Sequence, residues 1–402
     1  MLFPDAPILG QVALSYCPII DRHRNVMATR LTVFPLGQAA RWLPVGELMR
    51  TVGEVWPKDG PQVVLSVRCE SLLADLLMVQ PAPNVMIEVP KFMAGDPAHR
   101  DDILQLAANG NTLLLSGRPN HPLPRELLGA FRYSIIDLAD ERRLDAGPPP
   151  PGVTRSIGFF QEGVTTIEQM EGAFQRGALA VLGWPVDEAV QPRRVGSGGI
   201  RPDLQITLDL INQVNNEEPL AQLEATLRRD PSLAFKLMRY INSPVFGLTV
   251  EVNSFAQAVM LLGYQRLKRW LSLLLVTAGN DQNLRPVMFA AVRRGLLMEA
   301  LARDGADADE RSEMFICGVF SLLDRMFQKS FDELLTALPV PAGVHAALVH
   351  EAGPYFPVLD LVRTLEGGSG FDVRDHVQAC DLPMRHVNRA LLRSLGSALQ
   401  MA

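Results

Sequence analysis

The stretch from Arg229 to Leu275 decides the fold of the second half of the chain. It reads Arg-Asp-Pro-Ser-Leu-Ala-Phe-Lys-Leu-Met-Arg-Tyr-Ile-Asn-Ser-Pro-Val-Phe-Gly at residues 229–247, and Asn-Ser-Phe-Ala-Gln-Ala-Val-Met-Leu-Leu-Gly-Tyr-Gln-Arg-Leu-Lys-Arg-Trp at residues 253–270. Asp230 can cap a helix with its side chain, and Pro231 suits the first helical position, where its missing N–H costs nothing. Apolar residues then recur every three to four positions, which predicts one buried helix face made of Leu233, Leu237, Met238 and Ile241.

Local breaks divide this stretch into several helices. Asn242 and Ser243 precede Pro244, and a residue before proline is pushed out of the α-helical region, so the first helix is expected to end there. Ser254 can cap a second helix, and Gly263 is expected to break it before a third begins. The second half of the chain is therefore predicted to be helical.

As a whole, the stretch resembles the signature of the HDOD domain, an all-helical signalling module related to the HD metal phosphohydrolases. The complete string in this order is more specific than capped amphipathic helices alone. The matching residues are Asp230, Pro231, Ser232, Leu233, Asn242, Ser243, Phe246, Gly247, Ala258, Val259, Leu262 and Gly263. The resemblance implies a helical signalling domain.

Composition restricts the class of protein. A chain of 402 residues, 48% of them apolar, is too long for one ordinary domain and can bury a core in each of two. The net charge of −6 argues against broad binding to nucleic acid or to an anionic membrane. The four cysteines have no metal-ligand spacing and are expected to be idle thiols in a reducing compartment. Because no apolar run reaches about 18 residues and no leader pattern opens the chain, a cytoplasmic protein without a membrane span is expected.

The first half alternates short apolar runs with helical patterns. Such runs are typical of buried parallel strands, and the arrangement favours either a barrel or a doubly wound sheet. The runs lie at residues 63–67, 84–89, 112–115, 134–137 and 156–160. The stretch at residues 189–201 is interpreted as a linker, because it is polar and rich in Gly, Pro and Ser, between domains at residues 1–188 and 202–402.

Three motifs in the first half resemble the EAL domain, the (β/α) barrel of cyclic-di-GMP phosphodiesterases. Residues 18–22 with Val26 and Met27 resemble its opening strand and hairpin, Glu-Gly-Val-Thr-Thr at residues 162–166 resembles its Glu-Gly-Val-Glu-Thr motif, and Leu-Gly-Trp-Pro at residues 182–185 resembles its closing motif. The two resemblances together give the order of bacterial EAL–HDOD two-domain signalling proteins. The predicted fold class is therefore α/β plus all-α, with a degenerate EAL-type barrel followed by a helical HDOD domain.

The resemblance also implies two divalent cations in an active EAL domain, held by carboxylates and an Asn at the strand ends. In this chain Arg30 stands at the Glu of the name-giving motif, Arg68 stands at the Asn ligand, and Ser-Gly at residues 116–117 replaces an Asp-Asp pair. Glu88 and Asp137 keep family carboxylates. Further departures are Phe34, Ile135 and Thr165. A guanidinium stays charged and repels a metal ion, so no catalytic site, metal or cofactor is expected.

Two interpretations of the arginines remain open. Arg30 and Arg68 have the charge and fork geometry to clamp an anion or a phosphate without metal. Alternatively, they form an ion pair with Glu88 that only neutralises the abandoned site. The second interpretation is favoured, because Phe34 and Ile135 have removed other polar groups.

The helical half shows a similar loss. Residues 315–322, Phe-Ile-Cys-Gly-Val-Phe-Ser-Leu, resemble the helix that carries the His-Asp pair of HD enzymes, but Ser321 and Leu322 stand at that pair. These side chains cannot replace an imidazole and a carboxylate on a metal. A single amphipathic helix is predicted at residues 313–327. His345 and His350, five positions apart, are not expected to share a helix face or to bind metal.

The expected function is signalling without catalysis, through contacts with protein partners whose identity the sequence leaves open, as it does the oligomeric state. Arg266, Lys268 and Arg269 are the candidate docking face, although three cations in an acidic chain are also typical of a solvated helix face. The first alternative is a receptor that binds cyclic-di-GMP without metal or hydrolysis. An active phosphodiesterase is disfavoured by the lost ligands.

Overall fold

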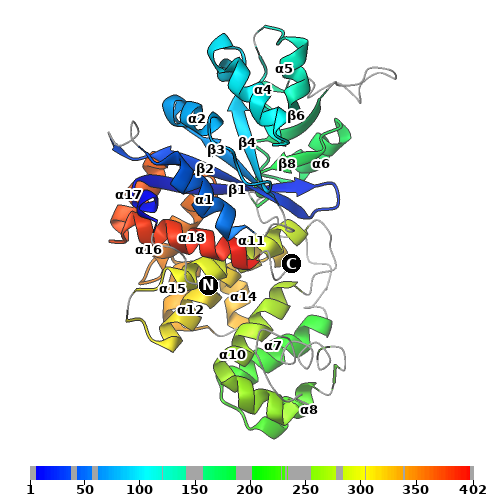
Figure 1. The fold of residues 1–402 in the computed structure, drawn as a ribbon. Helices are drawn as coiled ribbons and strands as arrows, with labels where there is room; N and C mark the ends of the chain where they lie inside the picture. Colours follow the sequence, from blue (N-terminus) through cyan, green and yellow to red (C-terminus); the bar gives the residue numbers. More distant parts are fainter. Residues whose placement is uncertain are drawn as a thin grey trace. The chain divides into compact units, whose positions relative to one another are not determined.

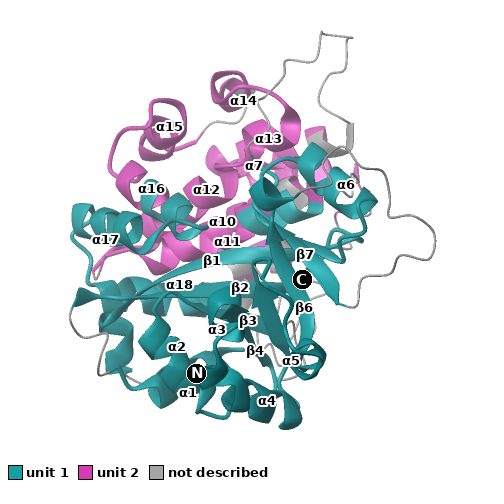
Figure 2. Cartoon of the chain, turned by 90° about the horizontal axis from the view of Figure 1, so that it is seen from above, with its two compact units in different colours: residues 1–188, 285–290, 360–402 teal, residues 189–284, 291–359 magenta. Residues whose placement is uncertain are grey.

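A computed structural model gives the fold of the 402-residue chain (Figure 1). It describes residues 6–37, 43–56, 62–119, 121–141, 157–186, 202–227, 229–230, 233, 255–277, 284–303, 305–337 and 340–398. The chain divides into two compact units (Figure 2). Unit 1 comprises residues 1–188, 285–290 and 360–402, and unit 2 comprises residues 189–284 and 291–359.

Unit 1 contains a closed barrel of eight strands that follow one another around the barrel in chain order. The strands are β1 (Val12–Asp21), β2 (Val26–Pro35), β3 (Gln62–Val67), β4 (Val85–Pro90), β5 (Leu113–Ser116), β6 (Phe131–Asp137), β7 (Gly158–Glu162) and β8 (Ala180–Leu182). The predicted barrel is confirmed, and the doubly wound sheet is excluded because β1 pairs with both β2 and β8. The five predicted apolar runs fall on β3 to β7.

Strand β1 is antiparallel to both of its neighbours, whereas β2 to β8 are parallel to one another. Only residues 22–25 join β1 to β2, and so short a connection can join antiparallel strands but not parallel ones. The carboxylate of Asp21 holds this turn by accepting hydrogen bonds from the backbone N–H groups of His23 (2.8 Å) and Asn25 (2.9 Å). The barrel therefore opens with a hairpin and continues with parallel strands.

The barrel interior is filled by one layer of apolar side chains. Alternate residues of a strand point to the same face, so each strand contributes at least one inward residue to this layer. The layer consists of Ile19, Ala28, Val64, Met86, Leu114, Ile135, Phe160, Ala180 and Leu182, all of them buried. Cys17 and Tyr133 pack against it, and the ring of Tyr133 stacks on that of Phe160 at 4.6 Å.

Helices of unit 1 cover the outside of the barrel. Helix α1 shows why they do so, because Val45, Leu48, Val52 and Val55 lie on one face of the helix and are buried. The α-helices of this unit are α1 (Val45–Val55), α2 (Glu70–Leu77), α3 (Lys91–Ala94), α4 (Arg100–Ala108), α5 (Arg125–Ala130), α6 (Ile167–Gln175), α17 (Gly370–Ala379) and α18 (Met384–Ala398). Short 3-10 turns lie at η1 (Pro7–Gly10), η3 (Pro97–His99) and η4 (Leu138–Asp140).

The motif at residues 182–185 closes the barrel. Gly183 has a φ of +133°, and a Cβ at this position would overlap the backbone carbonyl of Val164. The backbone N–H of Gly183 also donates to the carbonyl of Pro18 (3.3 Å). Only glycine permits this approach of two backbone segments. Trp184 follows directly, and its ring lies 6.4 Å from the ring of Phe289, which belongs to the 285–290 segment of unit 1.

In the described part of unit 2 all regular elements are helices, which confirms the predicted helical second half. They are α7 (Pro202–Asn215), α8 (Leu220–Leu227), α10 (Phe255–Thr277), α12 (Ala308–Phe320), α13 (Leu323–Phe327), α14 (Phe331–Ala337) and α15 (Ala342–Val349), while α11 (Arg285–Ala300) and α16 (Phe356–Leu365) contain residues of both units. The domain limits 1–188 and 202–402 stay a prediction, and residues 189–201 lie outside the described residues.

Helices α11 and α12 cross at two glycines. A Cβ on Gly318 would lie 2.6 Å from the backbone N of Gly295, so neither position has room for a side chain.

Helix α12 ends at Phe320, where the hydroxyl of Ser321 donates to the carbonyl of Gly318 (2.7 Å). The prediction of one helix at residues 313–327 is therefore wrong, because this bond satisfies a carbonyl of the last helical turn and α13 begins separately.

Of the described helices, none combines the length and the apolar character that crossing a lipid bilayer requires.

Candidate functional site

A polar layer lies at the carboxyl end of the parallel strands. Because side chains alternate along a strand, residues two positions beyond the apolar interior layer face the same barrel axis. We call these residues the mouth layer: Arg30, Ser66, Glu88, Ser116, Asp137 and Glu162, one from each of β2 to β7. Parallel barrels carry their active sites at this end, so the mouth layer is the candidate site of unit 1.

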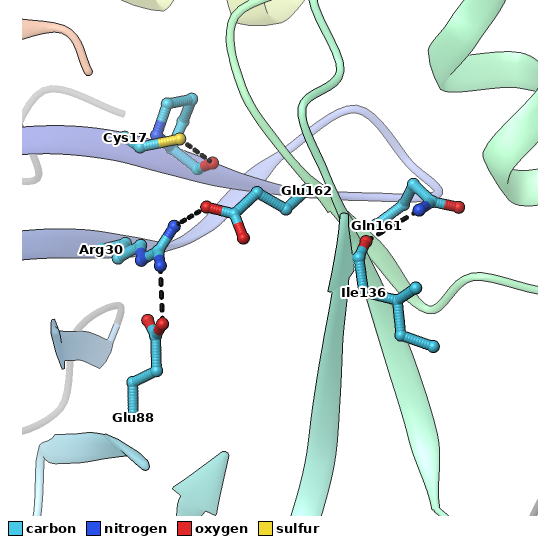
Figure 3. A network of polar contacts seen from close by, with 7 residues as sticks. Cys17, Arg30, Glu88, Ile136, Gln161 and Glu162 are labelled. Carbon is cyan, nitrogen blue, oxygen red and sulfur yellow. Dashed lines mark hydrogen bonds and ion pairs between the residues drawn. The ribbon is translucent and has the colours of Figure 1, made fainter. Parts of the chain in front are cut away.

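Arg30 lies between two carboxylates of the mouth layer (Figure 3). Its Nη2 donates to Glu88 Oε1 at 2.6 Å, and its Nη1 forms a second ion pair with Glu162 Oε1. The side chains of Arg30 and Glu88 are only 5% and 2% exposed, whereas that of Glu162 is 26% exposed. The favoured interpretation of Arg30, an ion pair with Glu88, thus matches the geometry, and Glu162 adds a second partner.

The charges of this cluster shift two pKa values. Burial lowers the pKa of Arg30, but the charges of Glu88 and Glu162 and their hydrogen bonds raise it by more, so the guanidinium is held in its charged form. Burial raises the pKa of the neighbouring Cys17 thiol to about 12, against the opposing effect of the Arg30 charge. Arg30 is therefore a permanent cation, and Cys17 is a neutral thiol at neutral pH.

The other two predicted mouth residues do not join the ion pairs. Arg68 lies just beyond the end of β3, two positions past Ser66, and it is exposed. Asp137 ends β6 and is the register partner of Glu162, but its Oδ1 accepts from the backbone N–H of Ala139 (2.8 Å) as the cap of η4. The expectation that Arg68 forms an ion pair with Glu88 is not fulfilled, because its place along β3 puts it on the rim.

The position of the expected Asp-Asp pair has a different backbone and a different neighbour. Gly117 has a φ of +83°, which disfavours a residue with a side chain. The aliphatic part of the Lys91 side chain packs 3.2 Å from the place that a Cβ on Gly117 would take. The side chain of Lys91 thus packs beside Gly117, where the resemblance implies a carboxylate.

These residues do not fit a pair of divalent cations. Mg²⁺ requires clustered oxygen ligands at about 2.1 Å, and Ca²⁺ requires even more of them. Arg30 already occupies the space between Glu88 and Glu162, and Asp137 is held by the backbone. Among the described residues, no group of three or more His, Cys, Asp or Glu side chains is arranged to hold a metal ion.

The predicted helix cap of unit 2 is present. Asp230 Oδ1 accepts a hydrogen bond from the backbone N–H of Leu233 at 3.1 Å, the bond expected of an N-cap residue. Gly263 has a φ of +69° and a ψ of 165° inside α10, so it breaks the helix there as predicted. Six of the other signature residues lie outside the described residues: Pro231, Ser232, Asn242, Ser243, Phe246 and Gly247. Ala258, Val259 and Leu262 lie in α10.

The three basic residues of the candidate docking face differ in their surroundings. Arg266 is exposed. Lys268 is half-buried, and burial lowers its pKa although the charges of Glu313 and Asp309 oppose the shift. Arg269 forms an ion pair with Glu299 and stacks on an aromatic ring of α12. Arg266 is therefore the exposed residue of the three.

The position of the expected His-Asp pair in unit 2 also contains an arginine. Ser321 is buried, and its hydroxyl oxygen accepts a hydrogen bond from Nη1 of Arg294 at 3.1 Å. The rings of His345 and His350 lie 5.5 Å apart. His350 is the C-cap residue of α15, and its backbone N–H donates to the carbonyl of Ala346.

Glu162 is the functional residue that the sequence analysis did not single out. It lies in the motif at residues 162–166, in which Thr165 is the residue that departs from the family pattern. The signal that identifies Glu162 is alternation, because it lies two positions after Phe160 of the barrel interior and so faces the mouth layer.

The sequence of residues 202–331 matches the HDOD domain family. This part of the chain is an HDOD domain. The resemblance that rested on the stretch from Asp230 to Gly263 is thereby confirmed. The HDOD domain contains helices α7 to α13, and both the Asp230 cap and the basic residues of α10 lie in it.

Two proteins are similar to the chain over longer stretches. The cyclic di-GMP phosphodiesterase CdgJ of Vibrio cholerae is 24% identical over 332 residues, which cover 81% of this chain and 76% of that protein. The uncharacterized protein YuxH of Bacillus subtilis is 28% identical over 220 residues, 54% of this chain and 53% of that protein. The chain therefore spans about half the length of YuxH. Among solved structures, the EAL enzyme Bd1971 in its cGMP-bound form is similar at 12% identity and a TM-score of 0.33, over 43% of this chain and 60% of that chain.

Proposed function

We propose that this chain is a non-catalytic protein of cyclic-di-GMP signalling that acts through contacts with protein partners. The HDOD domain and the similarity to a protein named a cyclic di-GMP phosphodiesterase support the signalling context. In this proposal the barrel is a stable scaffold whose mouth layer does not hydrolyse cyclic-di-GMP. The HDOD domain makes the contact with the partner.

The observation that carries this proposal is the position of the Arg30 guanidinium between Glu88 and Glu162. A guanidinium cannot be deprotonated in a protein, so the two carboxylates keep a cation that has no Lewis-acid chemistry. To admit a divalent metal ion, the protein would have to break both charge-assisted hydrogen bonds and leave a buried guanidinium without a partner. That exchange is unfavourable, because an uncompensated buried charge costs several kcal/mol.

A metal-independent receptor for cyclic-di-GMP is the second candidate function. The observation that favours it is Arg68, an exposed guanidinium at the carboxyl end of β3. Lys91 lies beside Gly117 at the end of β5 and adds a second cation to the same end of the barrel. Exposed guanidinium groups bind phosphate with paired hydrogen bonds and need no metal to do so.

Calorimetry with the full chain separates the alternatives. Cyclic-di-GMP is titrated into the protein in EDTA, in Mg²⁺ and in Mn²⁺, and the mixtures are then analysed for linear product. The non-catalytic proposal expects no product above a blank without protein under any condition, and turnover with either metal would refute it. Binding in EDTA that Arg68→Ala abolishes, while Arg125→Ala on the exposed surface of α5 retains it, would establish the receptor.

The contact with a partner is tested at Arg266. Charge reversal of Lys268 or Arg269 would also disturb the fold, whereas Arg266 is exposed. We expect an acidic partner, since opposite charges across an interface speed association. Full-length Arg266→Glu should therefore capture less of a cross-linked partner than the wild type, and Arg125→Glu, the same charge change on α5, should capture as much. Equal capture by all three proteins would place the partner surface elsewhere.

A further inference from the structure

One side of strand β1 lacks a neighbouring strand along most of its length. β1 pairs with β2 from Val12 to Ile20 but with β8 only from Ile19 to Asp21. Within the described barrel, residues 12–17 therefore have no strand on the β8 side. The open N–H and C=O groups of a strand edge pair readily with another chain unless something covers them.

The side chain of Asn388 in α18 takes the place of the missing strand. Its Oδ1 accepts from the backbone N–H of Leu14 (3.2 Å), and its Nδ2 donates to the carbonyls of Leu9 (2.7 Å) and Val12 (2.7 Å). A side-chain amide carries the same donor and acceptor as a peptide group, so it can continue a strand ladder at one residue. Asn388 is fully buried, which shields these three hydrogen bonds from water.

Two further contacts fix the same segment on the same strands. The hydroxyl of Tyr16, a buried residue of β1, donates to Oε1 of Glu366 at 3.2 Å. Gly370 begins α17 so close to Phe34 of β2 that an added Cβ would lie 2.6 Å from the Cβ of Phe34. Both figures show α17 and α18 beside β1 and β2 (Figures 1 and 2).

We propose that residues 360–398 form a clasp that completes the open edge of β1 and controls the packing of the mouth layer. Cys17 follows Tyr16 and is the register partner of Arg30, so a shift of β1 at Tyr16 changes the surroundings of the Arg30 ion pairs. The clasp directly follows residues 291–359 of unit 2 in the chain. It is thus a conformational device within unit 1, in which the packing of α17 and α18 sets the position of β1 in the barrel.

Cys17 provides a local reporter of the clasp in the full-length protein. We compare wild type, Asn388→Ala and Asn388→Asp, in which a carboxylate faces the carbonyls of Leu9 and Val12. Hydrogen exchange of the peptide that covers residues 12–17 and alkylation of Cys17 are each expected to rise about tenfold in both variants. The buried carbonyls of Leu9 and Val12 lose their donor in both, and Asn388→Ala also removes the acceptor of the Leu14 N–H. Gln378→Ala, an exposed change on α17, should leave both rates unchanged.

Gly370→Ala tests the clasp without touching a hydrogen bond. Alanine is the better helix former, so helix propensity alone predicts slower exchange of α17. The contact with Phe34 predicts the reverse, with faster exchange of α17 and faster alkylation of Cys17. Slower exchange of α17 with unchanged Cys17 alkylation would contradict the proposal.

The location of the faster hydrogen exchange distinguishes a local role of Asn388 from a general effect on stability. Faster exchange confined to β1 and the clasp, with Cys69 alkylated at its wild-type rate, supports the proposal. An equal increase along β3 to β7 would show that Asn388 only stabilises the whole protein, and unchanged rates in β1 would show that Asn388 does not hold its edge. Either result would overturn the proposal, and neither depends on nucleotide binding.

Discussion

The guanidinium carbon of Arg269 lies 3.9 Å from the centre of the Phe315 ring. The same guanidinium forms an ion pair with Glu299, so it joins α10 to α12 and α11 within unit 2. Arginine stacks on aromatic rings in this way because its charge is spread over a flat, weakly hydrated group. A residue that the sequence offered as part of a docking face therefore contributes to the packing of the HDOD domain.

Arg269→Ala is expected to destabilise the protein by about 1–2 kcal/mol, because the cation–π contact and a partly buried ion pair are lost together. Arg269→Lys should recover part of this loss, since it restores the charge but not the flat group. The free energy of unfolding is measured in urea, which does not screen charges. Arg266→Ala is the matched control and should change stability by less than about 0.5 kcal/mol.

Arg30→Met is expected to cost about 3–5 kcal/mol of stability, because it leaves the buried carboxylate of Glu88 and that of Glu162 without their cation. The measurement is again urea unfolding of the full chain. A triple variant with Glu88→Gln and Glu162→Gln as well should regain most of the loss, since no buried charge remains. A single variant as stable as the wild type would show that the ion pairs contribute nothing to the fold.

Asp230→Ala is expected to destabilise the HDOD domain by about 1 kcal/mol, because the N–H of Leu233 loses the oxygen that caps it. Asp230→Asn keeps a side-chain oxygen at the same place and should remain close to the wild type. Thermal unfolding of the three proteins checks this. If Asn lowers the midpoint as much as Ala does, charge near the helix terminus rather than the cap bond is responsible.

The Cys17 thiol makes stability depend on alkaline pH. Its pKa is raised by burial from an ordinary value of 9.0 to about 12. Between these values the folded protein keeps a proton that the unfolded chain has released, so the stabilisation is fully present below about pH 9 and is lost as the pH rises toward 12. Relative to Cys17→Ala, the wild type should lose about 1.4 kcal/mol per pH unit in this window. Parallel stability curves for the two proteins at alkaline pH would contradict the prediction.

Features that are local in the sequence could be predicted. The five apolar runs identified β3 to β7 because a buried strand needs only a short stretch of apolar residues. The Asp230 cap and the Gly263 break depend on one residue each and its conformational preference. The ion pair between Arg30 and Glu88 required the resemblance as well, because it joins β2 to β4 across the barrel mouth.

Features that depend on distant segments could not be predicted. Asn388 binds Leu14 from 374 positions away, and an Asn in an amphipathic helix gives no sign of its partner. The sequence also does not indicate that residues 360–402 belong to unit 1, since their helical pattern is equally suited to packing in the HDOD domain. Arg68 was grouped with Arg30 by motif position, whereas its distance along β3 puts it on the rim.

The pairing of β1 with β8 closes the barrel, and it sets the order in which the strands gain their partners during synthesis. Ile19 and Asp21 pair with Leu182 and Ala180, about 160 positions later, whereas every other strand pairs with the strand that comes before it in the chain. Contacts between distant residues form late because a long loop must be closed first. A ribosome therefore makes β1 before the other barrel strands, yet β1 gains its pairing with β8 and its hydrogen bonds to Asn388 only after those segments have been made. The first barrel strand to be made is the last to be completed, so nascent chains expose a pairing edge while the roughly 370 residues between β1 and Asn388 are translated.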